Sequence, residues 1–172
     1  VVVTPEFMRD FDPASFPITW EERPAALTVS QAISADAAQL HDGRDNNLMC
    51  GGFVQCGDAA AALAEADVTV EGEFKSGFVE HGYIEPEAGF AEVVDGCVEV
   101  HACTQAPVMD LDALELILDM PRDQIRIRPT GVGGGFGSKL DLSVQPYLAL
   151  GALKTGRPVR LTFSRTESMQ ST

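Results

Sequence analysis

The sequence predicts an α+β fold in which helices pack on mixed sheets. The clearest sign is a hairpin, because the segments GFAEVV and VEVHAC flank Asp95-Gly96, a dipeptide that favours a two-residue turn. Helical and strand patterns follow without the regular alternation of a doubly wound parallel sheet. The 172 residues, 45% of them hydrophobic, suffice for one sizeable core or two small ones.

Before the hairpin, regular structure is sparse. Residues 1–5 resemble the end of a strand, Pro-rich sequence follows, and residues 41–52 form a polar, Gly-rich loop. Asp58 is a candidate N-cap for an Ala-rich helix over residues 59–66. Residues 68–75 then alternate with period two, which predicts a strand.

After the hairpin, residues 108–120 predict an amphipathic helix that ends at Pro121. Its apolar residues recur at helical spacing: Leu111, Leu114, Ile117 and Leu118. Residues 125–129 follow as a strand, and the alternation in IRIRP places Ile125 and Ile127 on its inward face.

A Gly-rich loop over residues 131–137 precedes a second helix around residues 143–154. Pro146 either interrupts this helix or occupies its first turn, and Gly156 caps its end. Residues 159–163 form the last predicted strand, after which we expect no terminating helix.

The charge of the chain excludes some partners. Its formal net charge of -14 repels phosphate backbones and anionic lipids, so we expect neither nucleic acid nor a membrane surface as partner. No apolar run approaches the roughly 18–20 residues that a membrane span needs. We therefore expect a cytoplasmic protein.

The cysteines do not form a familiar metal motif. Both pairs have C-x5-C spacing, which differs from zinc-ribbon and common iron–sulfur patterns: Cys50 with Cys56, and Cys97 with Cys103. On one strand, the second pair would lie roughly 20 Å apart, beyond disulfide reach. We therefore interpret the cysteines as small buried hydrophobic residues in a reducing compartment.

The segment GVGGGFGSK at residues 131–139 is the most informative in the chain. Walker A requires adjacent Gly and Lys, but Ser138 intervenes, and no register supplies the glycine spacing of a dinucleotide fingerprint. Glycines add little to a core, yet they allow positive φ angles and close approach to the backbone. Two readings remain, a sharp turn or a loop that contacts an anion or cofactor, and we favour the second.

Other polar residues are less specific. His81 and Glu85, in VEHGYIEPE, are candidates for a metal cluster or an acid/base pair, but we favour a structural hydrogen-bonding role. His41 and His101 also read as structural. Gln105 follows a predicted strand and precedes a helix, so it is either an ordinary helix-entry residue or an amide that meets a ligand.

The order of several short motifs carries a family resemblance. GDAAAALAEADVTVEGEF, EHGYIEPEAGFAEVVDG, TQAP, IRIRPTGVGGGFGSK and GRPVRLTFSRTESM follow one another over about two thirds of the chain. Together they resemble the first molybdenum-cofactor domain of the xanthine dehydrogenase/aldehyde oxidase family. Residues 1–50 then correspond to the tail of a hammerhead-like domain and a linker, and residues 51–172 to the first part of the cofactor domain.

The resemblance implies an oxidoreductase that hydroxylates an aldehyde or N-heterocycle with water as the oxygen source. It implies a molybdenum–molybdopterin cofactor, with electrons passing to [2Fe–2S] clusters and FAD on partner domains or subunits. The remaining cofactor-domain segments are expected partners as well. The family's general-base Glu and most pterin contacts lie in later segments, so we expect no catalytic residue, no direct metal ligand and no turnover from this chain alone.

The resemblance also assigns site residues by position. Gln105 matches the glutamine whose amide bonds near the molybdenum oxygen ligands, and residues 134–137 match the loop whose backbone approaches the cofactor. This loop set is Gly134, Gly135, Phe136 and Gly137. Leu140 lies in the substrate pocket, at the place where xanthine-oxidising members have a Glu, and this departure favours an aldehyde-like substrate over xanthine.

Two other functions compete with this one. A non-catalytic scaffold or assembly module of the same fold predicts the same elements but no cofactor. A nucleotide-binding protein is less favoured, because both phosphate-loop templates fail and the chain is acidic.

Overall fold

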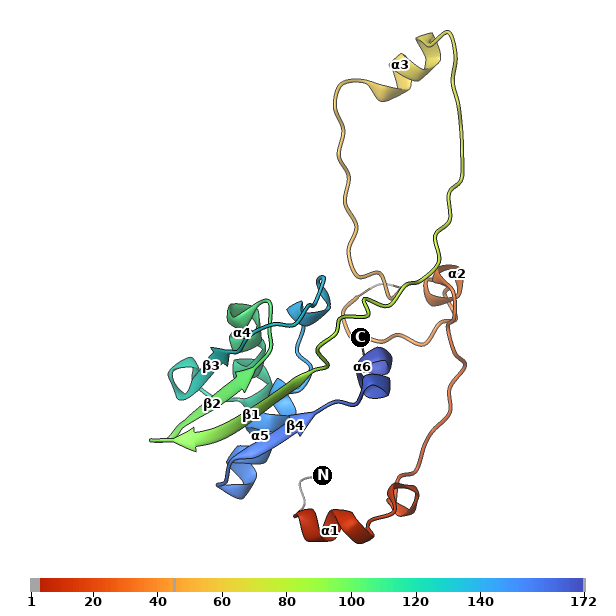
Figure 1. Ribbon diagram of the computed structural model, residues 1–172. Coiled ribbons are helices and arrows are strands. Elements are labelled where there is room, and N and C mark those ends of the chain that lie inside the picture. The colour runs from red at the N-terminus through yellow and green to blue at the C-terminus, as the bar shows by residue number, and fades with distance from the viewer. Residues whose placement is uncertain (1–3, 45, 172) are drawn as a thin grey trace. The chain divides into compact units, whose positions relative to one another are not determined.

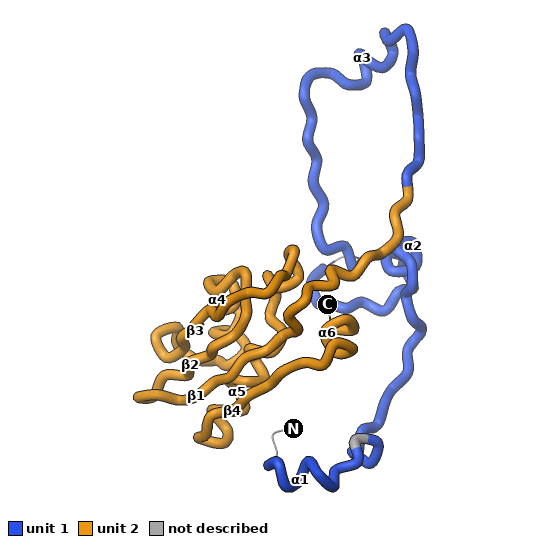
Figure 2. The backbone as a smooth tube through the Cα atoms, viewed as in Figure 1, with its two compact units in different colours: residues 1, 3–74 blue, residues 2, 75–172 orange. Residues whose placement is uncertain are grey.

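The computed structural model describes residues 4–44 and 46–171, which divide into two compact units, residues 4–74 and residues 75–171 (Figure 2). The second unit holds the sheet and the helices that cover it (Figure 1). None of the helices within the described residues is long and apolar enough to cross a membrane.

The second unit is built on a four-stranded mixed sheet with strand order β3-β2-β1-β4. The strands are β1 (Ala88–Val94), β2 (Cys97–Ala102), β3 (Ile125–Pro129) and β4 (Val159–Thr162). β1 runs antiparallel to β2 and β4, whereas β3 is parallel to β2. A parallel pair needs a crossover, which helix α4 (Pro107–Leu118) supplies, and the predicted α+β class is confirmed.

The predicted hairpin is also confirmed. Val94 pairs with Cys97, so only Asp95 and Gly96 form the turn. Both have positive φ, 51° and 80°, as a type I′ turn requires. An acidic residue that tolerates the left-handed region, followed by glycine, therefore sets the register of β1 against β2.

Both predicted helices of this unit are present, and Figure 1 shows them on one side of the sheet. Helix α5 spans Gln145–Thr155, and Pro146 lies in its first turn, where the missing N–H costs nothing. Gly156 ends it at φ 62°, a left-handed cap. Pro146 therefore begins the helix and does not interrupt it.

The core lies between the helices and the covered face of the sheet. Its most buried members are Ala91, Val98, Val100, Ala102, Leu114, Ile125, Val144, Leu148, Ala149 and Ala152. Ile125 and the partly buried Ile127 face this core, as the strand pattern predicts. Ile117 was expected on the buried face of α4, but that prediction is wrong, because its side chain remains 57% exposed.

The prediction of no terminating helix is wrong, because α6 spans Arg165–Ser171. Ser164 Oγ accepts from the N–H of Glu167 at 3.2 Å, and the Glu167 carboxylate accepts from the N–H of Ser164 at 2.7 Å. This is a reciprocal capping box. The Ser-x-x-Glu spacing was therefore a readable helix signal that the sequence reading missed.

The first unit contains four short helical elements and, among its described residues, no buried side chain. They are α1 (Pro5–Asp10), the 3-10 turn η1 (Pro13–Ser15), α2 (Val29–Ala32) and α3 (Ala59–Glu65). Asp58 caps α3 as predicted, since its carboxylate accepts from the N–H of Ala61 at 3.0 Å. The predicted opening strand lies mostly outside the described residues, and Thr4 is the N-cap of α1.

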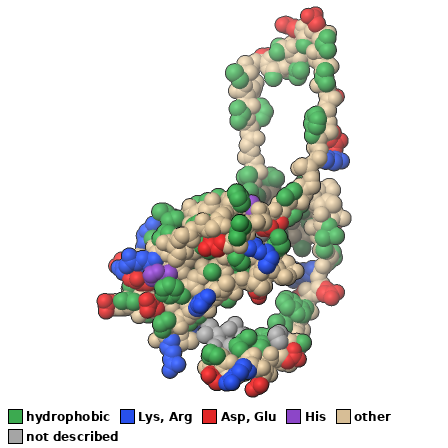
Figure 3. Space-filling model, in the orientation of Figure 1, with side chains coloured by type: hydrophobic (Ala, Val, Ile, Leu, Met, Phe, Trp, Pro, Cys, Tyr) green, Lys and Arg blue, Asp and Glu red, His purple; other side chains and the backbone are tan. Residues whose placement is uncertain are grey.

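The strand predicted over residues 68–75 is wrong, because the structure gives this stretch neither strand nor helix. Val68, Val70 and Phe74 are 80%, 92% and 94% exposed. Figure 3 shows hydrophobic side chains along the extended segments that flank α3. Alternation makes a strand only when another strand pairs with it, and the sheet among the described residues does not include this segment.

All four cysteines are free thiols. Cys103 is buried, but Cys50 and Cys56 are exposed, so the prediction of burial is wrong for these two. Both lie in the first unit, whose described residues include no buried side chain that could form an apolar interior around them.

Candidate functional site

The glycine-rich loop begins where the parallel strands β2 and β3 end. The N–H of Thr130 donates to the carbonyl of Ala102 at 3.1 Å, which extends the pairing one residue beyond β3. The loop then closes in a 3-10 turn, η3 (Ser138–Leu140). The loop therefore lies beside the end of β2, where Gln105 also lies.

Three consecutive glycines each face a different neighbouring residue. A Cβ added to Gly133 would lie 2.6 Å from Glu85 Cβ, one on Gly134 would lie 3.0 Å from Tyr83 Cβ, and one on Gly135 would lie 2.3 Å from Gln105 Oε1. Real side chains essentially never approach this closely at the first and third positions. The glycines thus allow two distant segments, residues 83–85 and the end of β2, to pack against one loop.

The side chain of Gln105 is seated on this loop. Its Oε1 accepts from the N–H of Gly137 at 3.0 Å, and its backbone N–H donates to the carbonyl of Lys139 at 2.9 Å. Because a backbone N–H can only donate, the contact identifies the oxygen of the amide. The Nε2 group donates to none of the described residues, so its two protons remain available to a ligand.

The loop also presents backbone donors. The N–H groups of Gly134, Gly135 and Phe136 donate to none of the described residues. Gly134 and Phe136 have positive φ, 100° and 52°, the second of which is uncommon for a side-chain-bearing residue. Phe136 is 75% exposed. This run of unpaired donors is typical of a backbone that receives an anion or another acceptor-rich group.

A polar cluster lies against the loop. Lys139, only 3% exposed, donates from Nζ to the Glu85 carboxylate at 2.8 Å, and its ammonium lies 4.6 Å from the centre of the Tyr83 ring. Burial raises the pKa of Glu85, but the hydrogen bonds from Lys139 and from the N–H of Gly133 outweigh it and hold the pKa below its usual value. Glu85 is therefore an ionised partner of a buried lysine.

Tyr83 continues this cluster on its other side. Its hydroxyl donates to the buried carboxylate of Glu87 and lies 3.5 Å from Ser138 Oγ. Burial, followed by the hydrogen bond to Glu87, raises the pKa of Tyr83. The phenol therefore stays protonated and acts as a structural donor.

Leu140 borders this arrangement, because its N–H donates to the carbonyl of Gly137 at 3.3 Å. Leu140 ends η3 and is 41% exposed. His81 and His41 are exposed, and Glu85 takes the structural hydrogen-bonding role that we favoured. Groups of three or more His, Cys, Asp or Glu side chains arranged to hold a metal ion are absent from the described residues.

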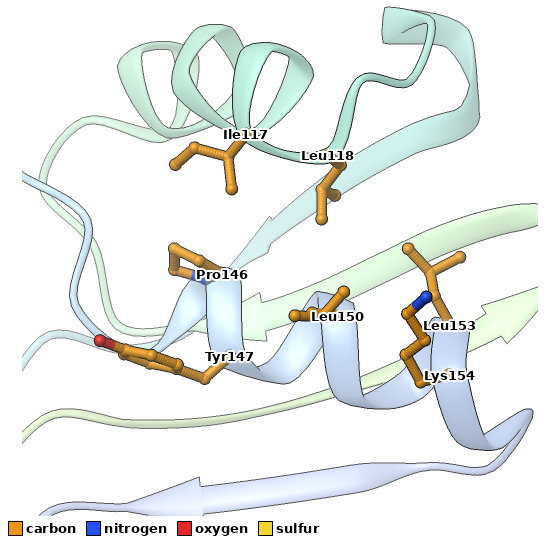
Figure 4. A pocket seen from close by; sticks show the side chains of 7 residues that line it. All are labelled: Ile117, Leu118, Pro146, Tyr147, Leu150, Leu153 and Lys154. Carbon is orange, nitrogen blue, oxygen red and sulfur yellow. The ribbon is translucent and has the colours of Figure 1, made fainter. Parts of the chain in front are cut away.

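A separate groove lies between α4 and α5 (Figure 4). It is lined by Ile117, Leu118, Pro146, Tyr147, Leu150, Leu153 and Lys154. None of these residues belongs to the glycine loop or is hydrogen-bonded to Gln105 in the described part of the chain, so we distinguish the groove from the candidate site.

A family model, described as molybdopterin cofactor-binding domain, matches residues 40–172. The chain belongs to this family. The match includes both the glycine loop and Gln105.

Three proteins similar to this chain confirm its resemblance to xanthine dehydrogenases and aldehyde oxidoreductases. The nicotinate dehydrogenase large molybdopterin subunit of Eubacterium barkeri is 35% identical over 88% of this chain and 35% of its own length. The xanthine dehydrogenase/oxidase of Rattus norvegicus is 35% identical over 88% of this chain and 11% of its own length. The solved aldehyde oxidoreductase from Desulfovibrio gigas matches 87% of this chain and 17% of its own, with a TM-score of 0.74 and 30% identity.

The chain thus spans between 11% and 35% of the lengths of these proteins. The activities of these relatives are therefore those of polypeptides much longer than this 172-residue chain.

Sequence reasoning missed three members of the site, Tyr83, Glu85 and Lys139, as a connected group. Each stands in a motif that the sequence displays, EHGYIEPE or GGGFGSK. Glu85 and Lys139 are 54 residues apart in the sequence, and spacing along the chain gives no information on a contact between such distant residues. The ion pair could therefore not be predicted from the sequence.

Proposed function

We propose that this chain forms one wall of a molybdenum-cofactor site in a hydroxylase, an oxidoreductase that adds water-derived oxygen to a carbon centre. The observation that carries the proposal is the orientation of the Gln105 amide. Its Oε1 accepts a hydrogen bond from the N–H of Gly137, while its Nε2 protons remain available to a ligand. Membership of the molybdopterin cofactor-binding domain family supports it.

The residues present fit such a cofactor. Molybdopterin and the oxygen ligands of its metal are rich in hydrogen-bond acceptors, and this site offers unpaired donors on the loop and on the Gln105 amide. When bound, the group supplies two-electron redox chemistry and a metal that makes water nucleophilic.

Each residue then has a defined task. Gln105 donates an amide hydrogen bond to an oxygen near the metal, and the glycine loop presents the N–H groups of Gly134, Gly135 and Phe136 to the cofactor. Preorganised donors need no reorganisation during the reaction, so they stabilise developing charge efficiently. The general base is expected in another part of the polypeptide, and we therefore expect no turnover from this chain alone.

We infer an aldehyde or N-heterocycle as the substrate class. Relatives named as nicotinate dehydrogenase, xanthine dehydrogenase/oxidase and aldehyde oxidoreductase support this range. Leu140, which we assign to the substrate pocket, has no hydrogen-bonding side chain and favours aldehydes over xanthine. Initial rates with a panel of aldehydes, nicotinate and xanthine test this assignment.

The proposal extends to the surroundings of the site. We propose the remaining cofactor-domain segments, [2Fe–2S] clusters and FAD on partner domains or subunits as neighbours. Residues 1–50 and 51–172 would be a hammerhead-like tail with its linker and the first part of the cofactor domain. A cytoplasmic location is also part of the proposal, and the four free thiols support it.

The decisive experiment measures molybdenum by mass spectrometry and pterin by fluorescence. It compares the 172-residue chain with the protein purified together with its natural neighbours. We expect both metal and pterin in the second sample only. Their absence from both samples would instead support a non-catalytic scaffold or assembly module of the same fold.

A further inference from the structure

An ion pair between a buried lysine and a partly buried glutamate connects the two halves of the candidate site. Lys139 has a side chain that is only 2% exposed, and its Nζ donates to the Glu85 carboxylate at 2.8 Å and to the Glu85 carbonyl at 2.9 Å. A buried ammonium is costly unless it is paired and hydrogen-bonded. The position of Glu85 is therefore strongly coupled to that of Lys139.

Glu85 holds the first part of the glycine loop. Its Oε2 accepts from the N–H of Gly133 at 2.8 Å, and its own N–H donates to the carbonyl of Gly133 at 3.3 Å. The missing side chain of Gly133 lets Glu85 approach, since a Cβ there would lie 2.6 Å from Glu85 Cβ. Glu85 is thus hydrogen-bonded to both the N–H and the carbonyl group of Gly133 in the loop.

Lys139 holds the other half. Its backbone carbonyl accepts from the N–H of Gln105 at 2.9 Å, and the Gln105 side chain in turn accepts from Gly137 at 3.0 Å. The contacts therefore form a ring from Gln105 through Lys139 and Glu85 to Gly133, and the backbone of residues 133–137 closes it at the Gln105 side chain. Apart from this backbone segment, the links of the ring are hydrogen bonds or ion pairs of 2.8 to 3.3 Å.

We propose that the Glu85–Lys139 ion pair is a positioning device that sets the glycine loop at its distance from the Gln105 amide. The inference rests on the proposed function, because it concerns the same cofactor site. Neither residue is a catalytic residue in this proposal, since both act through Gly133 and Gln105. Without the ion pair, the glycine loop can move relative to the Gln105 amide. The loop N–H groups and the Gln105 Nε2 group then no longer point toward the same cofactor.

The test uses Lys139→Met, Glu85→Gln and the double variant, in the protein purified with its natural neighbours. Glu85→Gln keeps an acceptor for the N–H of Gly133 but removes the charge. Glu99→Gln is the matched control, because Glu99 is a carboxylate with a 10% exposed side chain that pairs with Arg126 and Arg128 and makes no described contact with the loop. Bound pterin, melting temperature and amide hydrogen exchange are measured for each.

We expect both single variants to lose about 10- to 100-fold in cofactor affinity, the usual cost of removing a residue that orients a metal site. Amide exchange should accelerate in the peptides that cover residues 131–139, and the double variant should resemble the single ones. The control should lose stability to a comparable extent and keep its pterin. If Lys139→Met fails to fold, the gentler Glu85→Gln substitution still decides the question.

Pterin content within twofold of the wild type in every single variant that folds would overturn the proposal, as would an equal loss in Glu99→Gln. Exchange is also measured in cofactor-depleted protein, where unchanged rates at residues 131–139 would overturn it as well. Should the wild-type protein contain no pterin, the proposed function fails, but this exchange measurement still tests the positioning role.

Discussion

Neighbouring glycines in the loop are needed for different physical reasons. Gly137 has φ 100° and nothing within 4 Å of an added Cβ, so its backbone conformation alone favours glycine. Gly135 lacks a positive φ, and only the nearby Gln105 amide excludes a side chain there. Substitution at Gly135 therefore perturbs the amide while leaving the backbone in an allowed conformation.

Gly135→Ala should impair the site much more than the fold. The new methyl group would displace Gln105 Oε1, which lies 2.3 Å from its position, and break the hydrogen bond from Gly137. One such bond contributes about 0.5–1.5 kcal/mol to stability, whereas a displaced orienting group costs about 10- to 100-fold in activity or metal affinity. Urea unfolding and pterin content measure the two effects separately.

Gly131→Ala is the matched control, because an added Cβ meets nothing within 4 Å there and no positive φ is involved. It should behave as the wild type in both measurements. A Gly135→Ala protein that retains full cofactor content and turnover would contradict the assigned role of Gln105.

At the scale of elements, α5 packs on β1 through a glycine. A Cβ on Gly89 would lie 2.5 Å from the carbonyl oxygen of His101 and 2.9 Å from Leu148 Cδ1. The first neighbour is the backbone of the adjacent strand and cannot rotate away. Close approach of sheet and helix at this point therefore depends on the absence of a side chain.

Gly89→Ala should lower the free energy of unfolding by about 1–3 kcal/mol, the usual cost of overpacking a core. Gly77→Ala, at a position where an added Cβ meets nothing within 4 Å, should change it little. Equal urea midpoints for both variants would show that β1 and α5 separate more easily than the structure implies.

The beginning of α4 contains a buried carboxyl group, Asp110, which is 1% exposed and accepts from Gln145 Nε2 at 3.1 Å. Burial raises its pKa, against hydrogen bonds from Thr104 and Gln145 that lower it. A carboxyl group with a raised folded-state pKa stabilises the fold fully only below its unfolded pKa of about 3.9. That contribution is lost as the pH rises through the folded-state pKa.

Asp110→Asn should therefore gain stability relative to the wild type as the pH rises from acid to neutral. The amide keeps an acceptor for Gln145 but does not ionise. Urea unfolding at a series of pH values measures the difference, and Asp123→Asn on the exposed 3-10 turn η2 (Arg122–Gln124) is the control. A constant difference between Asp110→Asn and wild type across the series would refute the prediction.

At the scale of the whole molecule, the two units differ in how much they bury. Residues 75–171 enclose a core, whereas none of the described residues of the first unit is buried. Phe53 and Phe74 are 86% and 94% exposed. Segments without buried apolar contacts open at little free-energy cost, and proteases cut such segments first.

Limited chymotrypsin digestion of the 172-residue chain should cut first beside Phe53 and Phe74 and leave the sheet unit intact. Mass spectrometry identifies the fragments. Digestion of the sheet unit at the same rate as these sites would mean that its core is less stable than the packing of α4 and α5 on the sheet indicates.

Local sequence signals predicted much of the second unit. Asp95-Gly96 predicts a turn because both residues accept positive φ, and Gly156 predicts a helix end for the same reason. The Ser164-x-x-Glu167 capping box shows that one further element was predictable from its local signal. Signals of this kind act within a few residues, so they are present in the sequence itself.

Other features depend on contacts between distant segments. Residues 68–75 alternate as a strand does, but pairing requires a partner strand that the alternation cannot specify. Gln105 and the glycine loop were predicted as a site by resemblance, yet only the fold brings the Gln105 amide within 3.0 Å of Gly137. The sequence by itself determined the fold class, the hairpin, the main helices and the family. The tertiary structure decided which glycine faces which side chain, and it paired Glu85 with Lys139. The physical reason is that burial of the Lys139 ammonium is costly without an opposite charge, and only the folded chain brings Glu85, 54 residues away, to that ammonium.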